Sequence, residues 1–270
     1  MNREIRKEVQ SGPQVVILCG GKGTRLREQT ESVPKPLVEV GGMPILWHLM
    51  KIYAHYGFHD FVLCLGYKGE MIKEFFAEWR PWRNGDFVLE FAGGEARVTS
   101  KLDQLDGWTI RFAETGDETN TGGRLKRVEP YIHTSPFFVT YADGLSDIDL
   151  TSLLKFHESK GTVGTMTCVM PRSQFGIVEI DDEDRILRYD EKPVMREWVS
   201  GGFFVFDRRI FSYLGEDDVL EKEPFDRLAR DRQFSAYRFK GFWACMDTYK
   251  DTQMLNDLWR SGRAPWRVWR

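Results

Sequence analysis

Short apolar runs alternate with segments of helical periodicity through the first half of the chain. Residues 14–19 (QVVILC), 60–65 (DFVLCL) and 136–144 (PFFVTYADG) read as buried strands. Between the first two, residues 44–56 space apolar side chains as a helix does, and residues 69–79 follow as a second helix. This order predicts an α/β fold: a mostly parallel sheet with helices on both faces, which binds ligands beyond the carboxyl ends of its strands.

The second half has a different pattern. From residue 163 strands follow one another closely, in TVGTMTCVM, FGIVEI, RILRYD and SGGFFVFD, before helical stretches near 223–231 and 247–260. No linker separates the patterns. We therefore expect an N-terminal extension over residues 1–13 and one domain over 14–270. Its first half, about 14–145, would bind a nucleotide, and its more antiparallel second half, about 146–270, a substrate.

Charge and apolar content exclude several classes of protein. The chain has 270 residues and a net charge of −3, so no overall basic field would gather nucleic acid. No apolar run is long enough to span a bilayer, and the first residues lack the apolar core of a signal peptide. We expect a cytoplasmic protein with no membrane or nucleic-acid partner and with free, buried cysteines.

A glycine-rich turn, CGGKGTRL at 19–26, follows the first strand directly. Successive backbone amides in such a turn form a nest for an anion, to which an arginine adds a planar cationic fork. Dinucleotide-binding and Walker A motifs are excluded, since Leu26 and Gly23 stand where those motifs need a small residue and a Ser or Thr. A tight turn bearing a surface arginine is the alternative. The candidate phosphate-binding residues are Gly20, Gly21, Gly23, Thr24 and Arg25.

Lys35 lies between two prolines in SVPKPLVEVGG. Pro34 and Pro36 restrict the local backbone, so the lysine is presented with little conformational freedom. A cation fixed in this way suits phosphoryl chemistry. The alternative is a rigid loop with a solvated lysine.

With GGKGTRL followed by PKP, the chain resembles the sugar 1-phosphate nucleotidyltransferases, also called nucleotide sugar pyrophosphorylases. The resemblance covers all but the first dozen or so residues. It is closest to the bacterial glucose-1-phosphate cytidylyltransferases, in PILWHLMKIY, DFVLCLGYKG, ETGDETNTGGRLKRV, SGGFFVF, GFWACMDT and APWRVW. It implies a Rossmann-like nucleotide-diphosphosugar transferase fold.

The activity that this resemblance implies is transfer of a cytidylyl group from CTP to glucose 1-phosphate, giving CDP-glucose and pyrophosphate. The sugar phosphate would attack the α-phosphorus in line, with Mg²⁺ as cofactor, and the product would supply deoxysugars for surface polysaccharide. UTP, dTTP or another sugar 1-phosphate remain alternatives. A noncatalytic nucleotide-sugar-binding subunit is a further one, although such a protein would lose the lysines or the metal carboxylates.

The resemblance also assigns roles on the nucleotide side. Arg25 and Lys35 would neutralise the triphosphate, and Asp143 in YADG with Asp247 in MDT would hold Mg²⁺. Mg²⁺ prefers hard oxygen ligands, which agrees with two carboxylates, although either Asp alone would suit a turn or a helix cap. Thr121 and Gly122 fall in the segment that contacts the base.

On the sugar side, the DEKPV motif would place Glu191 on the sugar hydroxyls and Lys192, as a catalytic residue, on the attacking phosphate. Without the resemblance this charged pair reads as a solvated turn. Gly176, Gly201 and Gly202 would let the backbone approach the sugar closely.

The C-terminal tail interleaves tryptophans with arginines, and its glycine and proline break any amphipathic helix. We expect it to pack against the body or against a neighbouring subunit, since the resemblance implies a homo-oligomer. The five histidines show no metal-ligand spacing.

Overall fold

The computed structural model describes residues 12–21, 23, 26, 30, 32–79, 87–92, 95–100 and 107–269, and only the backbone of 87–92 and 95–100. The N-terminal extension predicted over 1–13 lies almost wholly outside the described residues. Among the described residues, no helix is both long enough and apolar enough to cross a membrane.

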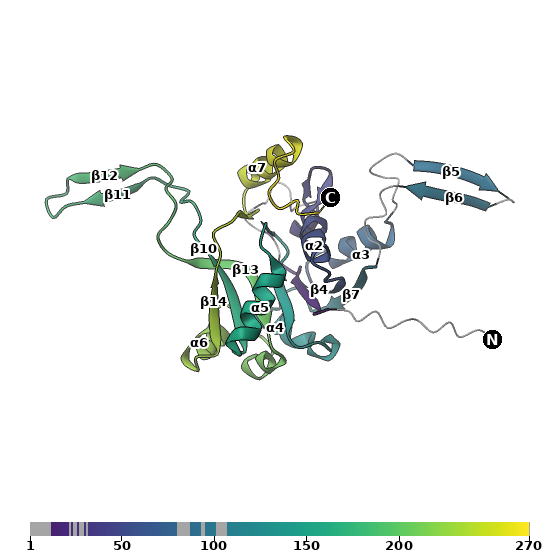
Figure 1. Cartoon of the computed structure of the whole chain (residues 1–270), viewed down its shortest axis with the longest axis horizontal. Helices are drawn as coiled ribbons and strands as arrows, with labels where there is room; N and C mark the ends of the chain where they lie inside the picture. Colours follow the sequence, from purple (N-terminus) through teal and green to yellow (C-terminus); the bar gives the residue numbers. More distant parts are fainter. Residues whose placement is uncertain are drawn as a thin grey trace.

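A seven-stranded sheet forms the centre of the molecule (Figure 1). Its pairings are parallel except at β13, which runs antiparallel to both of its neighbours. The predicted α/β fold is confirmed, including the antiparallel component from the second half of the chain. In spatial order the strands are β14 (Phe234–Arg238), β10 (Gly164–Val169), β13 (Val199–Phe206), β8 (Phe137–Tyr141), β1 (Val15–Leu18), β4 (Asp60–Leu65) and β7 (Thr109–Glu114).

Within the part of the chain that the structure describes, four two-stranded sheets supplement the central one. The β11–β12 hairpin projects away from the body (Figure 1), and most of its side chains are exposed. The β9–β15 pair lies at the edge where β8 ends. The pairs are β2 (Glu39–Val40) with β3 (Met43–Pro44), β5 (Phe87–Ala92) with β6 (Glu95–Ser100), β9 (Gly144–Ser146) with β15 (Trp243–Cys245), and β11 (Ile177–Ile180) with β12 (Ile186–Asp190).

Helices cover both faces of the sheet. The helices expected at 44–56, 69–79, 223–231 and 247–260 are present with small shifts at their ends, whereas α5 was not predicted. Pro44 precedes the first of them as its N-cap and does not lie inside its first turn. The helices are α2 (Ile45–His55), α3 (Gly69–Ala77), α4 (Thr121–Arg127), α5 (Leu150–Lys160), α6 (Glu223–Arg230) and α7 (Tyr249–Arg260), with 3-10 turns η2 (Lys35–Leu37), η4 (Glu129–Tyr131) and η5 (Arg208–Tyr213).

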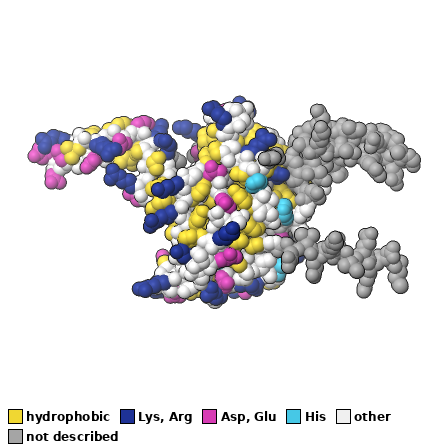
Figure 2. Space-filling model, in the orientation of Figure 1, with side chains coloured by type: hydrophobic (Ala, Val, Ile, Leu, Met, Phe, Trp, Pro, Cys, Tyr) yellow, Lys and Arg dark blue, Asp and Glu magenta, His cyan; other side chains and the backbone are white. Residues whose placement is uncertain are grey.

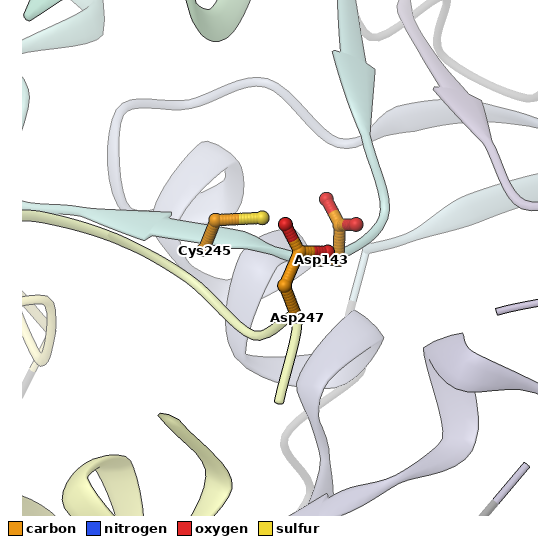
Figure 3. A group of neighbouring side chains, drawn as sticks. All are labelled: Asp143, Cys245 and Asp247. Carbon is orange, nitrogen blue, oxygen red and sulfur yellow. The ribbon is translucent and has the colours of Figure 1, made fainter. Parts of the chain in front are cut away.

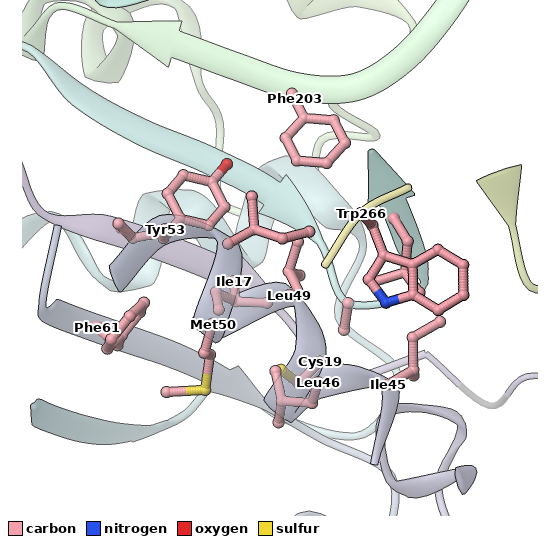
Figure 4. Close-up of a cluster of buried hydrophobic side chains, with 14 of the residues drawn as sticks. Ile17, Cys19, Ile45, Leu46, Leu49, Met50, Tyr53, Phe61, Phe203 and Trp266 are labelled. Carbon is pink, nitrogen blue, oxygen red and sulfur yellow. The ribbon is translucent and has the colours of Figure 1, made fainter. Parts of the chain in front are cut away.

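Alternate side chains of β1 enter two separate hydrophobic clusters. Val15 and Ile17 pack with α2 on one face, while Val16 and Leu18 pack on the other face with side chains from α4 and α6. Figure 4 shows the first cluster, in which α2 lies over the sheet. Burial on both faces explains the nearly continuous apolar sequence of this interior strand.

The C-terminal tail packs against the body of its own chain. Trp266 is fully buried, and its indole nitrogen donates to His48 Nδ1 at 3.4 Å. His48 Nε2 donates to the Val40 carbonyl at 2.7 Å, and burial lowers the pKa of His48 to about 4. Of the two expected positions for the tail, the structure shows packing against the body.

Candidate active site

The candidate site lies at the carboxyl ends of β1 and β8, which are adjacent and parallel, with Leu18 beside Tyr141. The glycine turn continues from β1, and Asp143 follows β8. Together they line an open cleft of about 400 Å³. Its described lining residues are Leu18, Cys19, Gly20, Gly21, Gly23, Lys35, Pro36, Thr119, Asn120, Thr121, Arg124, Tyr141, Ala142, Asp143, Val219, Glu221 and Asp247.

Backbone pairing brings Asp143 and Asp247 together. Strand β9 begins directly after Asp143, and its partner β15 ends two residues before Asp247, with Gly144 opposite Cys245. The Met246 amide donates to the Asp143 carbonyl at 2.9 Å. One ligand atom from each aspartate and the Cys245 sulfur all lie within 4.8 Å of one another. Figure 3 shows that sulfur pointing toward the carboxylates. The expected convergence of the two carboxylates is present in the fold.

Lys35 lies between these two carboxylates. Its ammonium is 2.5 Å from Asp143 Oδ2 and 2.6 Å from Asp247 Oδ1, and its side chain is only 13% exposed. Burial lowers the pKa of Lys35, but the charge of Asp143 and the hydrogen bonds to both aspartates outweigh it, so the pKa is raised overall. The lysine is therefore a charged group in the cleft wall, and the solvated-loop alternative for it is wrong.

The start of α7 fixes the backbone of Asp247. Thr248 is the N-cap and forms a capping box with Asp251, whose Oδ2 accepts from the Thr248 amide at 2.7 Å and the Asp247 amide at 3.1 Å. Such a cap satisfies amides that the helix itself leaves without acceptors. Asp247 is thus anchored to a helix on one side and to a strand pair on the other.

The three described glycines of the turn differ in what they allow. A β-carbon at Gly20 would lie 2.0 Å from the Arg124 guanidinium, and one at Gly23, where φ is +60°, would lie 3.1 Å from Lys35 Cβ. Gly21 faces open space. Two of the glycines therefore make room for neighbouring cationic side chains. Thr24 and Arg25 lie outside the described residues.

Arg124 ties the walls of the cleft together. Its guanidinium donates to carbonyls of Gly20 (3.1 Å), Leu65 (3.0 Å) and Gly116 (2.7 Å). The residue is 4% exposed, and burial lowers its pKa. Its position explains why residue 20 is a glycine, yet nothing in the sequence pattern singled out Arg124.

Thr121, at the start of α4, also lines the cleft. Its hydroxyl donates to Glu221 Oε2 at 2.6 Å, and the Tyr141 hydroxyl donates to the other oxygen of that carboxylate. Tyr141 and Glu221 were not predicted as site residues. Gly122, in contrast, is packed beneath the cleft wall, because a β-carbon there would lie 2.7 Å from the Asp218 carbonyl.

The residues expected to bind the sugar phosphate do not line this cleft. Glu191 and Lys192 follow β12 at the base of the hairpin, where they form an exposed ion pair at 3.2 Å. A hydrogen bond from Tyr189 and one from Lys192 lower the pKa of Glu191. Gly176 packs against the Tyr189 ring.

Gly201 and Gly202 likewise serve packing in β13. A β-carbon at Gly201 would lie 3.1 Å from Val169, and one at Gly202, where φ is +74°, would lie 2.7 Å from the Tyr141 ring. The Gly201 carbonyl accepts from the Trp243 indole at 2.7 Å.

A second cavity connects the two regions. It is lined by Asp247, by the aromatic segment 239–243 and by Arg172, Phe175 and Val194 at the base of the hairpin. Because Asp247 belongs to both cavities, a molecule in the second one would border the carboxylates.

This arrangement fits a divalent cation and an anionic ligand. Two half-buried carboxylates converge on one point, already occupied by a cationic group, and carboxylate oxygens are the ligands that Mg²⁺ prefers. The adjacent glycine turn and Lys35 offer amides and positive charge to phosphate oxygens. The cleft is therefore suited to holding a metal–phosphate complex.

Comparison with known proteins agrees with this chemistry. The family model described as "Nucleotidyl transferase" matches residues 14–259. The chain is 43% identical over 258 residues to a "Probable glucose-1-phosphate cytidylyltransferase" of Bacillus subtilis (strain 168), covering 95% of this chain and all of that protein. It is 39% identical to the glucose-1-phosphate cytidylyltransferase of Salmonella typhi, covering 95% and 99% of the two chains.

A solved structure also shares the fold. The crystal structure of HddC from Yersinia pseudotuberculosis superimposes with a TM-score of 0.66 at 22% identity, covering 92% of this chain and all of the other. At that identity the likeness concerns the fold alone.

Proposed function

The chain belongs to the nucleotidyl transferase family, and from this premise we propose that it transfers a cytidylyl group from CTP to glucose 1-phosphate. The products would be CDP-glucose and pyrophosphate. The names of the two similar cytidylyltransferases support this choice of substrates, at 43% and 39% identity over nearly the whole chain. A cytoplasmic site of action and the single-domain boundaries at 14–270 remain parts of the proposal.

The observation that carries the proposal is the convergence of Lys35, Asp143 and Asp247 beside the glycine turn. A noncatalytic binding subunit would have no need to keep two carboxylates and a lysine at one point, since uncompensated carboxylates repel a triphosphate. All three groups are present: the aspartates lie beside the paired strands β9 and β15, and Lys35 lies in the 3-10 turn η2. An enzyme is therefore favoured over a sensor.

Each group has a task in this reaction. The amides of the glycine turn would hold the triphosphate, with Gly21 leaving open space beside it, and Lys35 would neutralise charge that moves toward the leaving pyrophosphate. Asp143 and Asp247 would hold the divalent ion that the family generally uses, which we propose to be Mg²⁺. When bound, the ion would stabilise negative charge on the α-phosphate.

The sugar phosphate is proposed to enter from the second cavity. Its border with Asp247 would present the attacking oxygen to the α-phosphorus, and its aromatic wall includes Phe242 and Trp243. Lys192 would hold the sugar phosphate and Glu191 the sugar hydroxyls if the base of the hairpin lies over this cavity in the complex. Both side chains are about half exposed, which leaves them free to take a ligand.

For the base, Thr121 and Glu221 offer hydrogen-bonding groups in the wall of the cleft. Cytosine and uracil present opposite donor and acceptor pairs at their pairing edge, so buried hydrogen bonds would discriminate them. UTP or dTTP remain the alternatives within the same reaction class.

We also propose that the protein is a homo-oligomer assembled through the β11–β12 hairpin. Six apolar side chains of this hairpin are between 44% and 64% exposed, and Figure 2 shows hydrophobic and charged side chains interleaved along it. A two-stranded hairpin is marginal in water by itself, so a second copy covering these side chains would stabilise it. They are Ile177, Val178, Ile180, Ile186, Leu187 and Tyr189.

Sedimentation of the double variant Ile186→Asp/Leu187→Asp tests this assembly. We expect a shift toward monomer, while the matched charge change Glu183→Gln at the same hairpin leaves the mass unchanged. An unchanged mass in the double variant would exclude the hairpin as the interface.

The test of the function is pyrophosphate release across CTP, UTP, dTTP and GTP with several hexose 1-phosphates. We expect turnover only with both substrates and a divalent ion, and CTP with glucose 1-phosphate as the preferred pair. Equal rates with the pyrimidine triphosphates would exclude the assignment of CTP as the preferred nucleotide. If no pair of substrates released pyrophosphate, the proposed enzymatic activity would be excluded.

A further inference from the structure

Lys35 occupies the position that a metal ion would take between the aspartates. Its ammonium contacts Asp143 and Asp247 at 2.5 and 2.6 Å. Those carboxylates supply oxygens spaced closely enough for one ion to bind both. A Mg²⁺ ion bonded to those oxygens at about 2.1 Å would face the ammonium directly, and the two cations would repel each other. The ion and the ammonium therefore compete for the same pair of carboxylates.

We propose that Lys35 exchanges partners during substrate binding: it neutralises Asp143 and Asp247 in the empty cleft and moves to the triphosphate when metal and nucleotide enter together. This inference rests on the proposed function. It adds that the site binds free metal only weakly until a phosphate chain provides Lys35 with a new anionic partner.

The local structure allows this exchange without backbone movement. Pro34 is extended and the buried Pro36 stands within η2, so the backbone of Lys35 is fixed. Four rotatable bonds of the side chain nevertheless let the ammonium move. Its stem runs beside Gly23, in the turn where the phosphates are expected. Torsions of one side chain suffice to transfer the ammonium from the carboxylates to a phosphate oxygen.

Coupling between metal and nucleotide follows. Metal alone must displace a 13% exposed ammonium and leave it without an anion, which is unfavourable in a partly buried site. Nucleotide removes that cost, so each ligand strengthens the binding of the other, and such coupling commonly amounts to about 5- to 150-fold in affinity. A permanent ion pair would give no such effect.

The test measures Mn²⁺ binding to the full chain without nucleotide, from the free-ion signal in electron paramagnetic resonance. Lys35→Met keeps the stem and removes the charge, and we expect it to bind Mn²⁺ about 10-fold more tightly or better. Lys35→Arg keeps a cation and should bind Mn²⁺ as weakly as the wild type. Lys35→Gln is a second neutral variant in case the first does not fold.

A matched control is Lys73→Met. Lys73 also contacts two carboxylates, those of Glu70 and Glu114, but on an exposed surface outside the cleft. We expect its Mn²⁺ affinity to stay within about twofold of the wild type, since exposed carboxylates are solvated without a partner.

Two outcomes would overturn the exchange: equal Mn²⁺ affinity in wild type and the neutral variants, or a gain of the same size in Lys73→Met. Because the readout is metal binding, it is independent of turnover. Tighter Mn²⁺ binding in a protein that forms no sugar nucleotide would leave the exchange standing and remove the proposed function. If the wild type forms the sugar nucleotide but the neutral Lys35 variants bind Mn²⁺ no more tightly, the proposed function stands and the exchange is excluded.

Discussion

The cleft and the β11–β12 hairpin hold their charged residues in opposite ways. In the cleft, Lys35 is 13% exposed and contacts two carboxylates that are 24% and 32% exposed. At the base of the hairpin, Lys192 and Glu191 are 48% and 58% exposed and form an ion pair with each other at 3.2 Å. The residues of the cleft form a set that is fixed by the fold, whereas those of the hairpin form a loosely held set on the exposed surface.

This difference shows which part of the proposed reaction the single chain preorganises. Pairing of β9 with β15 and the capping of α7 position the carboxylates before any ligand binds. An exposed ion pair contributes at most about 1 kcal/mol, too little to hold two long side chains in one geometry. We therefore expect the proposed sugar-phosphate residues Glu191 and Lys192 to take their working geometry only when a ligand, a second copy of the chain or both contact them.

The largest expected effect comes from the fixed set. Asp143→Asn and Asp247→Asn keep size and remove charge, and each should lower the rate of pyrophosphate release by about 10² to 10³, or roughly 3 to 4 kcal/mol. The double variant should lose less than the product of the two, because both residues act through one ion. Asp257→Asn, an exposed carboxylate on α7, is the control.

A fully multiplicative double variant would mean that the aspartates act independently. The cleft would then no longer count as one preorganised unit, and its contrast with the hairpin would weaken.

How far the sequence predicted this unit depends on the residue. Asp143 could be placed at a strand end from the apolar run before it, and Lys35 from its flanking prolines. Asp247 came only from the resemblance, since the strands that bring it to Asp143 have three residues each and carry no readable periodicity. Short strands of that kind form only because the surrounding chain already positions them.

The roles of the glycines are the hardest to predict from sequence. Ligand contact by Gly122, Gly201 and Gly202 stays a prediction, and in the fold these residues also make room for Asp218, Val169 and Tyr141. A glycine in a sequence shows that something comes close to the backbone, not what it is. Arg124 and Glu221 could not be found at all, because the contacts that tie them to the cleft, with Gly20 and Thr121, join residues 104 and 100 positions apart.

The second effect tests the packing that supports the Lys35 loop. His48 bonds the Val40 carbonyl beneath the C-terminal tail, and burial, aided by the charge of Arg267, lowers its pKa from 6.5 to about 4. Unfolded His48 takes up a proton near pH 6.5 and folded His48 only near pH 4. The unfolded state therefore binds more protons between these values, and stability falls as the pH drops through this window.

The loss should approach about 3 kcal/mol by pH 4. Denaturant titrations at several pH values check it, and the difference between wild type and His48→Gln isolates the contribution of this one side chain. Parallel profiles for the two proteins would show that His48 is not the titrating group.

The third effect concerns the loosely held set. Lys192→Ala should raise the KM for glucose 1-phosphate by about 10- to 100-fold and leave the KM for CTP nearly unchanged, as expected for loss of one charged hydrogen bond to the sugar phosphate. Arg188→Ala removes a neighbouring cation that pairs with Asp190 on the same hairpin and should change neither constant. A raised KM for CTP alone would reverse the role assigned to Lys192.

The smallest effect addresses how rigidly the cleft is held. Thr248→Ala removes the N-cap hydroxyl of α7, which accepts from the Asp251 amide at 3.2 Å, and should lower the free energy of unfolding by about 1 kcal/mol. Because Asp251 also accepts from the Asp247 amide, the loosened cap should reduce turnover a few-fold, far less than Asp247→Asn does. Thr248→Ser keeps the hydroxyl and should restore both quantities. Denaturant unfolding and pyrophosphate release, measured on the same preparations, separate the two effects. A rate loss as large as that of Asp247→Asn would mean that the position of the Asp247 carboxylate depends on this one helix cap. The contrast between the fixed residues of the cleft and the loosely held residues of the hairpin would then disappear.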